Sequence, residues 1–130
     1  MEREKVLEIF AQVRKRYNLQ GEVMDYSRQM ADAMDREDNT SVQMLVFMRR
    51  DSVQELAATR ARIEELLGEC SDEDKKHMRD LLNGAPGTDP LENRIAEQIA
   101  SNSRLLKQIV ELYRRLNKKV THEQSVYDEN

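Results

Sequence analysis

The side chains that most often carry chemistry are few in this sequence. His77 and His122 lie far apart, so they cannot form the i, i+4 histidine pair of a helical zinc site. Cys70 is the only cysteine, which excludes an internal disulfide and a thiolate zinc site. No base lies near it in a pattern typical of nucleophilic catalysis. These residues therefore indicate no metal centre or catalytic thiol, and a lone cysteine suits a reducing cytosol.

Phosphate chemistry can be weighed on the same residues. A phosphotransfer histidine would lie on a long bundle helix beside a cation, and His77 does follow Lys75 and Lys76. Its segment is short and acidic, however, which disfavours that role. The sequence also has no Gly-rich phosphate loop after a strand and no Gly-x-Ser-x-Gly turn.

The arginines offer one further enzyme hypothesis. Small all-helical chorismate mutases hold a dicarboxylate with arginines inside a helical bundle, and Arg49 and Arg60 occupy core-type heptad positions here. Arg94 and Arg104 lie on the last helical segment. Interior arginines of thin bundles usually extend to solvent or pair with Glu, and the companion Lys, Glu and Gln at matched spacings are not recognisable. We therefore predict a protein that is not an enzyme and needs no cofactor, and keep the mutase as a minor alternative.

The composition is that of one acidic helical domain. The chain has 130 residues, of which 38% are hydrophobic, 35% charged and only 5% aromatic. This length fits a single domain over residues 1–130, and the composition is typical of long, solvated helices. The net charge of −4 argues against nucleic-acid binding, which needs a basic face. The basic cluster of Arg114, Arg115, Lys118 and Lys119 suits a helix C-terminus instead.

The sequence pattern indicates neither a targeting segment nor a membrane segment. The first ten residues, MEREKVLEIF, are charged and amphipathic, and they lack the apolar region of a signal peptide. The longest apolar run, MLVFM at 44–48, is far shorter than the ~20 residues that span a bilayer. We expect a soluble, cytoplasmic protein without membrane insertion.

Heptad spacing predicts three long helices that pack lengthwise. In the first, at about residues 2–36, apolar side chains recur every seven positions: Phe10, Tyr17, Met24 and Ala31. Gly21 is the weak point of this segment, because glycine costs up to ~1 kcal/mol relative to alanine inside a helix, and the sequence leaves open whether the helix is continuous, kinked or broken there. The second helix should span about residues 41–67, with Gly68 as its C-cap.

Polar turns separate the helices and supply their caps. The turn at 35–41 offers several N-cap candidates: Asp38, Asn39, Thr40 and Ser41. Ser71 and Asp74 form a capping-box pattern that opens a short helix ending at Leu82.

The last long helix should begin after Asp89 as N-cap, with Pro90 at its first position. We expect it to reach about Val120 and to be followed by a polar, frayed tail at 121–130. The predicted fold is all-α: an elongated antiparallel bundle of three long helices plus one short helix.

This last helix carries three heptad rows, more than one neighbouring helix can cover. The rows are Leu91, Gln98, Leu105 and Leu112; Ile95, Asn102, Ile109 and Leu116; and Ile99, Leu106, Tyr113 and Val120. Because a coiled-coil seam uses two rows, we expect one to stay open between Leu106 and Val120 as a site for an amphipathic partner helix. Asn102 interrupts an otherwise apolar row, where it either sets the register, as a buried amide does in a coiled coil, or lies at a wet edge.

The second helix carries another candidate surface. Met44, Phe47 and Met48 belong to an apolar stretch with almost no polar face for two turns. A helical hairpin would bring methionines of the first helix close to them. The stretch is either ordinary core or an adaptable surface for a partner's helix, because methionine repacks easily around different side chains.

Two segments carry a family resemblance. The segment REDNTSVQMLVFMRRDSVQELAATRARIEELL joins an acidic turn to spaced leucines and a basic residue, and IASNSRLLKQIVELYRRL places Asn102 before Leu105 and Leu106. In these patterns the chain resembles the FlgN-type flagellar type III export chaperones, within the broader group that includes the FliT-type chaperones. The resemblance covers most of the chain and rests on pattern.

The resemblance implies a chaperone that binds the C-terminal amphipathic helix of hook–filament junction (hook-associated) proteins and keeps them soluble and unassembled before type III secretion. The expected client-binding residues are Asn102, Leu105, Leu106, Ile109, Leu112, Tyr113, Leu116 and Val120, together with Met44, Phe47 and Met48. Contact with export-apparatus components and homodimer formation stay open, as does the identity of the client. The main alternative is a structural coiled-coil subunit that self-associates and has no transported client.

Overall fold

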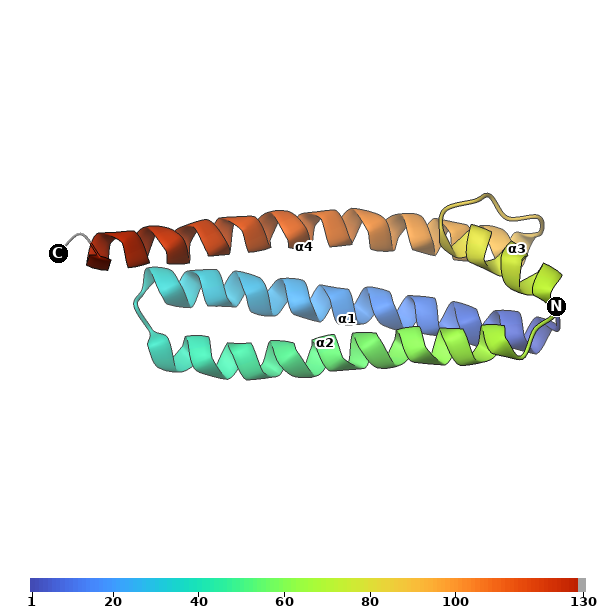
Figure 1. Cartoon of the computed structure of the whole chain (residues 1–130), viewed down its shortest axis with the longest axis horizontal. Coiled ribbons are helices and arrows are strands. Elements are labelled where there is room, and N and C mark those ends of the chain that lie inside the picture. The colour runs from blue at the N-terminus through green and yellow to red at the C-terminus, as the bar shows by residue number, and fades with distance from the viewer. Residues whose placement is uncertain (129–130) are drawn as a thin grey trace.

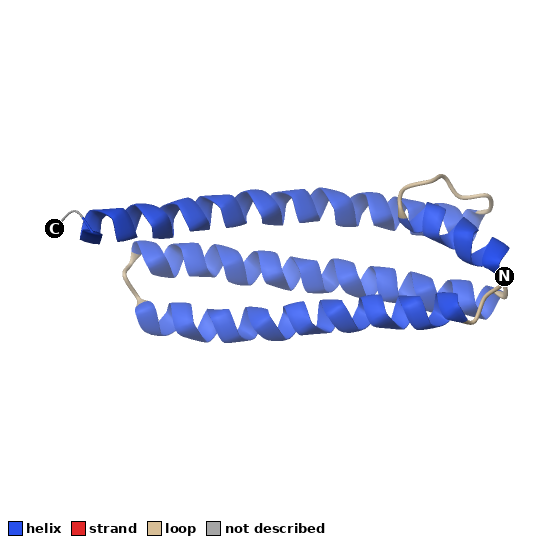
Figure 2. Ribbon diagram, in the orientation of Figure 1, coloured by secondary structure: helices blue, strands red, loops and turns tan. Residues whose placement is uncertain are grey.

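Four helices make up most of the described chain. The structure is a computed structural model that describes the backbone of residues 1–128 and the side chains of residues 1–118. Within that backbone there is no strand, and the helices are α1 (Arg3–Asp35), α2 (Asn39–Gly68), α3 (Asp72–Leu82) and α4 (Pro90–Asp128) (Figures 1 and 2). The predicted all-α class, with three long helices and one short one, is confirmed.

The helix α1 is the central helix of the arrangement. α2 folds back against it as an antiparallel hairpin, and α4 packs along another side of α1 (Figure 1). The loop after α3 returns the chain to the end at which α1 begins, so α4 runs parallel to α1 and antiparallel to α2. In the described part of the chain the backbones of α2 and α4 do not approach one another closely.

One heptad row from each of α1 and α4 forms their interface. The register is marked by Asn102, whose Nδ2 donates a hydrogen bond to the carbonyl oxygen of Val13 at 3.1 Å. The facing rows repeat every seven residues, and all of their members are buried: Val6, Val13, Gln20 and Ser27 on α1, and Ile95, Asn102, Ile109 and Leu116 on α4. Parallel helices keep a constant register, so one pairing determines the others.

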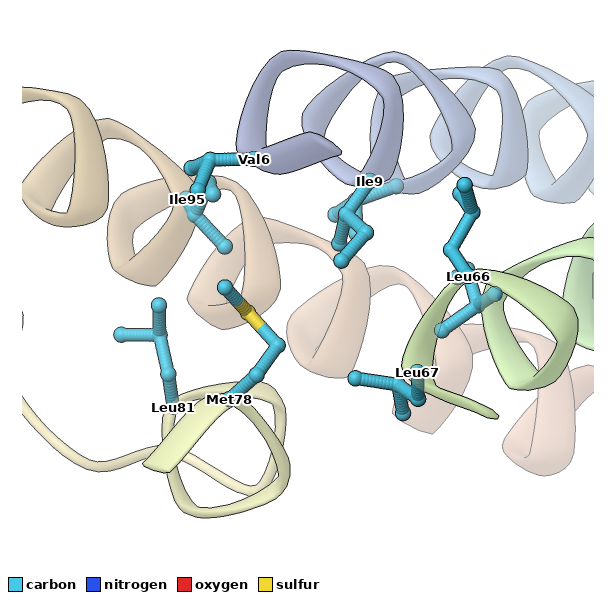
Figure 3. Packing of buried hydrophobic residues seen from close by; sticks show 9 residues of the cluster. Val6, Ile9, Leu66, Leu67, Met78, Leu81 and Ile95 are labelled. Carbon is cyan, nitrogen blue, oxygen red and sulfur yellow. The ribbon is translucent and has the colours of Figure 1, made fainter. Parts of the chain in front are cut away.

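The largest apolar cluster lies where all four helices meet (Figure 3). Its members are Val6, Ile9, Val13, Ile63, Leu66, Leu67, Met78, Leu81 and Ile95. The short helix α3 contributes Met78 and Leu81, which point toward Ile95 and the end of α2. Smaller clusters continue along the bundle, around Ile109 and then around Leu45. Each such side chain contributes ~1.5–3 kcal/mol of gross transfer free energy when fully buried.

The predicted caps are confirmed at three helix starts. Asp38 accepts a hydrogen bond from the Ser41 backbone N–H at 3.1 Å. Ser71 Oγ accepts one from the Asp74 N–H at 3.2 Å. Asp89 Oδ1 accepts one from the Glu92 N–H at 2.8 Å. Each bond satisfies a backbone donor that has no partner inside its own helix.

The helix is not broken at Gly21, which the sequence left open, and the prediction of Gly68 as a C-cap is wrong. α1 is continuous through Gly21, because buried neighbours on both sides, such as Leu19 and Val23, hold that turn against α1's partners and outweigh a propensity cost of up to ~1 kcal/mol. Gly68 belongs to α2 itself, and the C-cap is Glu69 in a right-handed conformation.

The last helix is longer than predicted. α4 continues through Asp128, past the expected end at Val120, and residues 121–128 contain no glycine or proline that would stop it. The side chains of this extension, that of Val120 included, lie outside the described ones.

Candidate partner-binding surfaces

Three of the expected client-binding residues face the inside of the molecule. Ile109 and Leu116 are buried in the α1–α4 interface, and Asn102 is only 6% exposed. Asn102 also accepts a hydrogen bond from Gln98 Nε2 at 3.0 Å, so its amide is bonded through both its oxygen and its nitrogen. In this structure the polar residue of the row sets the register between α4 and α1, and it is not available to a partner.

The other expected residues of α4 differ in accessibility. Leu105, Leu112 and Tyr113 are half-buried around the cluster of Ile109. Leu106 is 47% exposed. The row that was expected to stay open is therefore open at Leu106 and partly covered at Tyr113, whose ring lies under the Arg49 guanidinium at 3.9 Å. Val120 lies outside the described side chains.

The most exposed large apolar side chains lie near the start of α2. Met44 and Phe47 are 61% and 63% exposed, and Met48 is exposed as well, whereas Leu45 between them is buried against α1. Their spacing of three and four positions places them on one helical face. We call Met44, Phe47 and Met48 the methionine surface, and it is surface rather than core.

A cavity of about 440 Å³ adjoins the methionine surface. Its lining comes from the end of α1 and the start of α2: Gln29, Asp32, Arg36, Ser41, Met44, Leu45 and Met48. Among the residues whose side chains the structure describes, none from α4 lines it. The site therefore combines an apolar floor with a polar rim, a composition that suits the apolar stripe of an amphipathic helix and its flanking polar residues.

The expected client-binding residues do not form one continuous site. The described lining of the cavity beside the methionine surface comes from α1 and α2. Leu106 belongs to α4. Tyr113, also on α4, contacts Arg49 of α2, which lies on another side of that helix from Met44. Sequence spacing grouped these side chains of α2 but left open whether they are core or surface, and it could not place them relative to α4.

The histidine on α3 has a structural partner that the sequence analysis did not identify. His77 Nε2 lies 2.9 Å from Glu92 Oε1, and the same carboxylate oxygen accepts hydrogen bonds from the backbone N–H and the hydroxyl of Thr88 at 3.1 and 3.0 Å. Burial alone would raise the pKa of Glu92, but these hydrogen bonds and the nearby histidine outweigh it and lower that pKa. The network joins α3 to the start of α4. The sequence feature that could have indicated this network is Glu92 at the third position of α4, where a capping-box residue reaches back toward the start of its helix.

The arginines of the mutase hypothesis are dispersed. Arg49 stacks on Tyr113, and Arg94 lies 5.8 Å from the ring of Phe10. Arg60 lines a cavity with α3, and Arg94 lines a different cavity between α1 and α4. In the part of the chain that the structure describes, no group of three or more His, Cys, Asp or Glu is arranged to hold a metal ion.

Among the described helices, none combines the length and apolarity needed to cross a membrane. Comparison of the chain with protein-family models, with curated proteins and with solved structures gives no significant match.

Proposed function

We propose that this protein is a chaperone of the flagellar type III export pathway, which binds the C-terminal amphipathic helix of a hook-associated protein and keeps that client unassembled before export. The observation that carries the proposal is the methionine surface, three large apolar side chains presented to solvent beside a cavity of about 440 Å³. The family resemblance of the sequence supplies the class of client.

The energetics favour such a role for these side chains. Covering one large apolar side chain contributes ~1.5–3 kcal/mol of gross transfer free energy. Three of them, less the costs of ordering and association, are compatible with a micromolar complex. Methionine is suited to clients of differing sequence, because its flexible thioether side chain can repack.

The decisive experiment replaces Phe47 and Met48 with serine and measures binding of a hook-associated protein's C-terminal helix. We expect affinity to fall at least ~10-fold, equivalent to ~1.4 kcal/mol, while thermal stability changes little because both side chains are exposed. Leu7→Ser is the matched control. Leu7 is also an exposed apolar residue, but it lies near the start of α1, at the opposite end of the α1–α2 hairpin from the methionine surface.

Two outcomes would reject the proposal. Client binding that is unchanged in the folded double variant would exclude the methionine surface. Wild-type protein that self-associates through this surface and ignores the client helix would favour the alternative, a self-assembling coiled-coil subunit.

A further inference from the structure

A second uncovered surface lies along α2 and α4, on the side that α3 covers at one end. α3 packs against α4 and against the end of α2, and its Met78 and Leu81 fill the space between them (Figure 3). α3 ends at Leu82, whereas α2 and α4 both extend for several turns beyond the part that α3 covers (Figure 1). In the described chain, no further helix packs over that continuation.

A cavity of about 320 Å³ lies at the end of α3 and carries an excess of positive charge. Its lining residues are Arg16, Arg60, Ile63, Glu64, Leu67, Arg79, Leu82 and Asn83. Arg79 is neutralised, because its two terminal nitrogens donate to both oxygens of Glu64 at 3.3 and 2.8 Å. Arg16 and Arg60 have no ion pair or hydrogen bond with any described residue.

Burial and a neighbouring positive charge both disfavour the charged form of Arg16. Arg16 is half-buried, and burial together with the nearby charge of Arg60 lowers the pKa of Arg16. The protein therefore holds a pair of like charges next to apolar side chains without a counter-ion of its own. A carboxylate placed between them would offset the repulsion and accept hydrogen bonds from both guanidinium groups.

The same side of the bundle continues as an apolar surface. Arg49, eleven positions before Arg60, has a buried Nε without a hydrogen-bond partner and lies on the ring of Tyr113. Because α2 and α4 run in opposite directions, Val53, one turn after Arg49, lies level with Val110, one turn before Tyr113. Val53, Leu106 and Val110 are each between 42% and 47% exposed.

We propose that this surface, which we call the arginine strip (Arg16, Arg60, Val53, Leu106 and Val110), binds an acidic amphipathic helix of a partner protein, which would continue the line of α3 and complete a four-helix bundle. α3 is itself an acidic, amphipathic helix seated at one end of this line, with its apolar face inward. The partner's apolar stripe would cover Val53, Leu106 and Val110, and its carboxylates would meet Arg16 and Arg60.

The spacing of the arginines sets a requirement on the partner. One carboxylate of the partner would lie between Arg16 and Arg60, which line the same cavity. Arg49 and Arg60 are separated by about 17 Å along α2, so a second carboxylate eleven residues away on the same helical face would lie level with Arg49, whose Nε has no hydrogen-bond partner. This inference goes beyond the proposed function, because it concerns a different side of α2 and does not use the methionine surface.

The test uses the full-length protein and three labelled peptides of about 18 residues, enough to span the strip at 1.5 Å per residue. All carry the same leucine stripe, and two positions eleven residues apart are both Glu, both Gln or both Lys. We expect the Glu peptide to bind at least ~10-fold more tightly than the Gln peptide, and the Lys peptide to bind least. The preference should shrink as salt rises, because exposed charges are screened.

Substitutions then locate the binding site. Arg16→Gln with Arg60→Gln should remove the part of the preference for Glu that comes from the glutamate between these two arginines, while leaving the Gln peptide's affinity unchanged, and neither change removes a native bond. Arg62→Gln is the matched control, since Arg62 pairs with Glu8 and Glu65 on another face of α2. Leu106→Ser, which removes apolar contact without adding charge, should weaken the Glu and Gln peptides alike.

Three results would overturn the inference: equal affinity for the Glu and Gln peptides, an undiminished preference for Glu in the Arg16→Gln/Arg60→Gln protein, or no saturable binding. Loss of peptide binding in the Phe47→Ser/Met48→Ser protein would place the peptide on the methionine surface and would also reject it. Retained peptide binding with lost client binding in that protein would support both proposals separately.

Discussion

The amide of Asn102 bonds α4 to α1 at a site that only these two helices form. Replacing it with Asp turns the nitrogen that donates to the Val13 carbonyl into an oxygen, and places a carboxylate where the side chain is 6% exposed. We expect the free energy of unfolding at pH 7 to fall by ~2–4 kcal/mol, because a buried charge would face an acceptor. Urea unfolding measures this loss.

The loss of unfolding free energy in the Asn102→Asp variant should become smaller as pH is lowered toward ~4, since protonation of the new carboxylate removes its charge and restores a hydrogen-bond donor. Ser103→Asp is the control, because Ser103 is exposed on the same turn. Equal losses in the two variants, or a loss independent of pH, would contradict the role assigned to Asn102.

The carboxylate of Glu92 makes a pH-dependent contribution to the free energy of unfolding. Its pKa in the folded protein is below the ordinary value of 4.5, because the hydrogen bonds from His77 and Thr88 outweigh burial. A carboxylate with a depressed pKa stabilises the fold above its unfolded-state pKa and loses that contribution as pH falls through the folded-state pKa. We expect Glu92→Gln to cost about 1 kcal/mol at pH 7 and progressively less below pH ~4.5.

Thermal unfolding across that pH range tests the contribution of Glu92. Glu97→Gln provides the comparison, since Glu97 is exposed on the same helix. A difference between wild type and Glu92→Gln that grows on acidification would have the wrong sign and would refute the assignment.

At the scale of the element, two glycines should respond in opposite ways to the same substitution. A Cβ at Gly21 would meet nothing within 4 Å, so Gly21→Ala should stabilise α1 by ~0.5–1 kcal/mol. A Cβ at Gly87 would lie 2.5 Å from the backbone nitrogen of Asn93 at the start of α4, so Gly87→Ala should destabilise by ~1–3 kcal/mol. Chemical denaturation of both variants measures the pair, and changes of the same sign would contradict this account.

At the scale of the whole molecule, the apolar clusters at the two ends of the hairpin draw their described side chains from different numbers of helices. The cluster around Ile9, Leu66 and Ile95 is enclosed by all four helices, whereas the cluster around Met30 and Leu45 consists of residues from α1 and α2. Local opening is easier where fewer apolar contacts must break. We expect backbone amides near Met30 and Leu45 to exchange at least ~10-fold faster than those near Ile9 and Leu66.

Native-state hydrogen exchange read by mass spectrometry or NMR measures this gradient. Uniform protection along α1 would show that the bundle opens only as a unit. Faster exchange around Ile9 than around Met30 would mean that α3 does not stabilise the end it covers.

The sequence by itself determined the helices, the N-caps of α2, α3 and α4, and the number of apolar rows on α4. These features depend on residues within about one turn of each other, such as Asp38 with Ser41 or Asp89 with Glu92, and on heptad spacing within one helix. Only the tertiary structure decided which row is covered. Asn102 meets Val13 across a separation of 89 residues, and no local pattern encodes that contact. The same holds for the exposure of Met44 and for the juxtaposition of Arg16 and Arg60, because each depends on which neighbouring helix covers a face, and heptad spacing is identical whether a face meets a helix of its own chain, a partner or water.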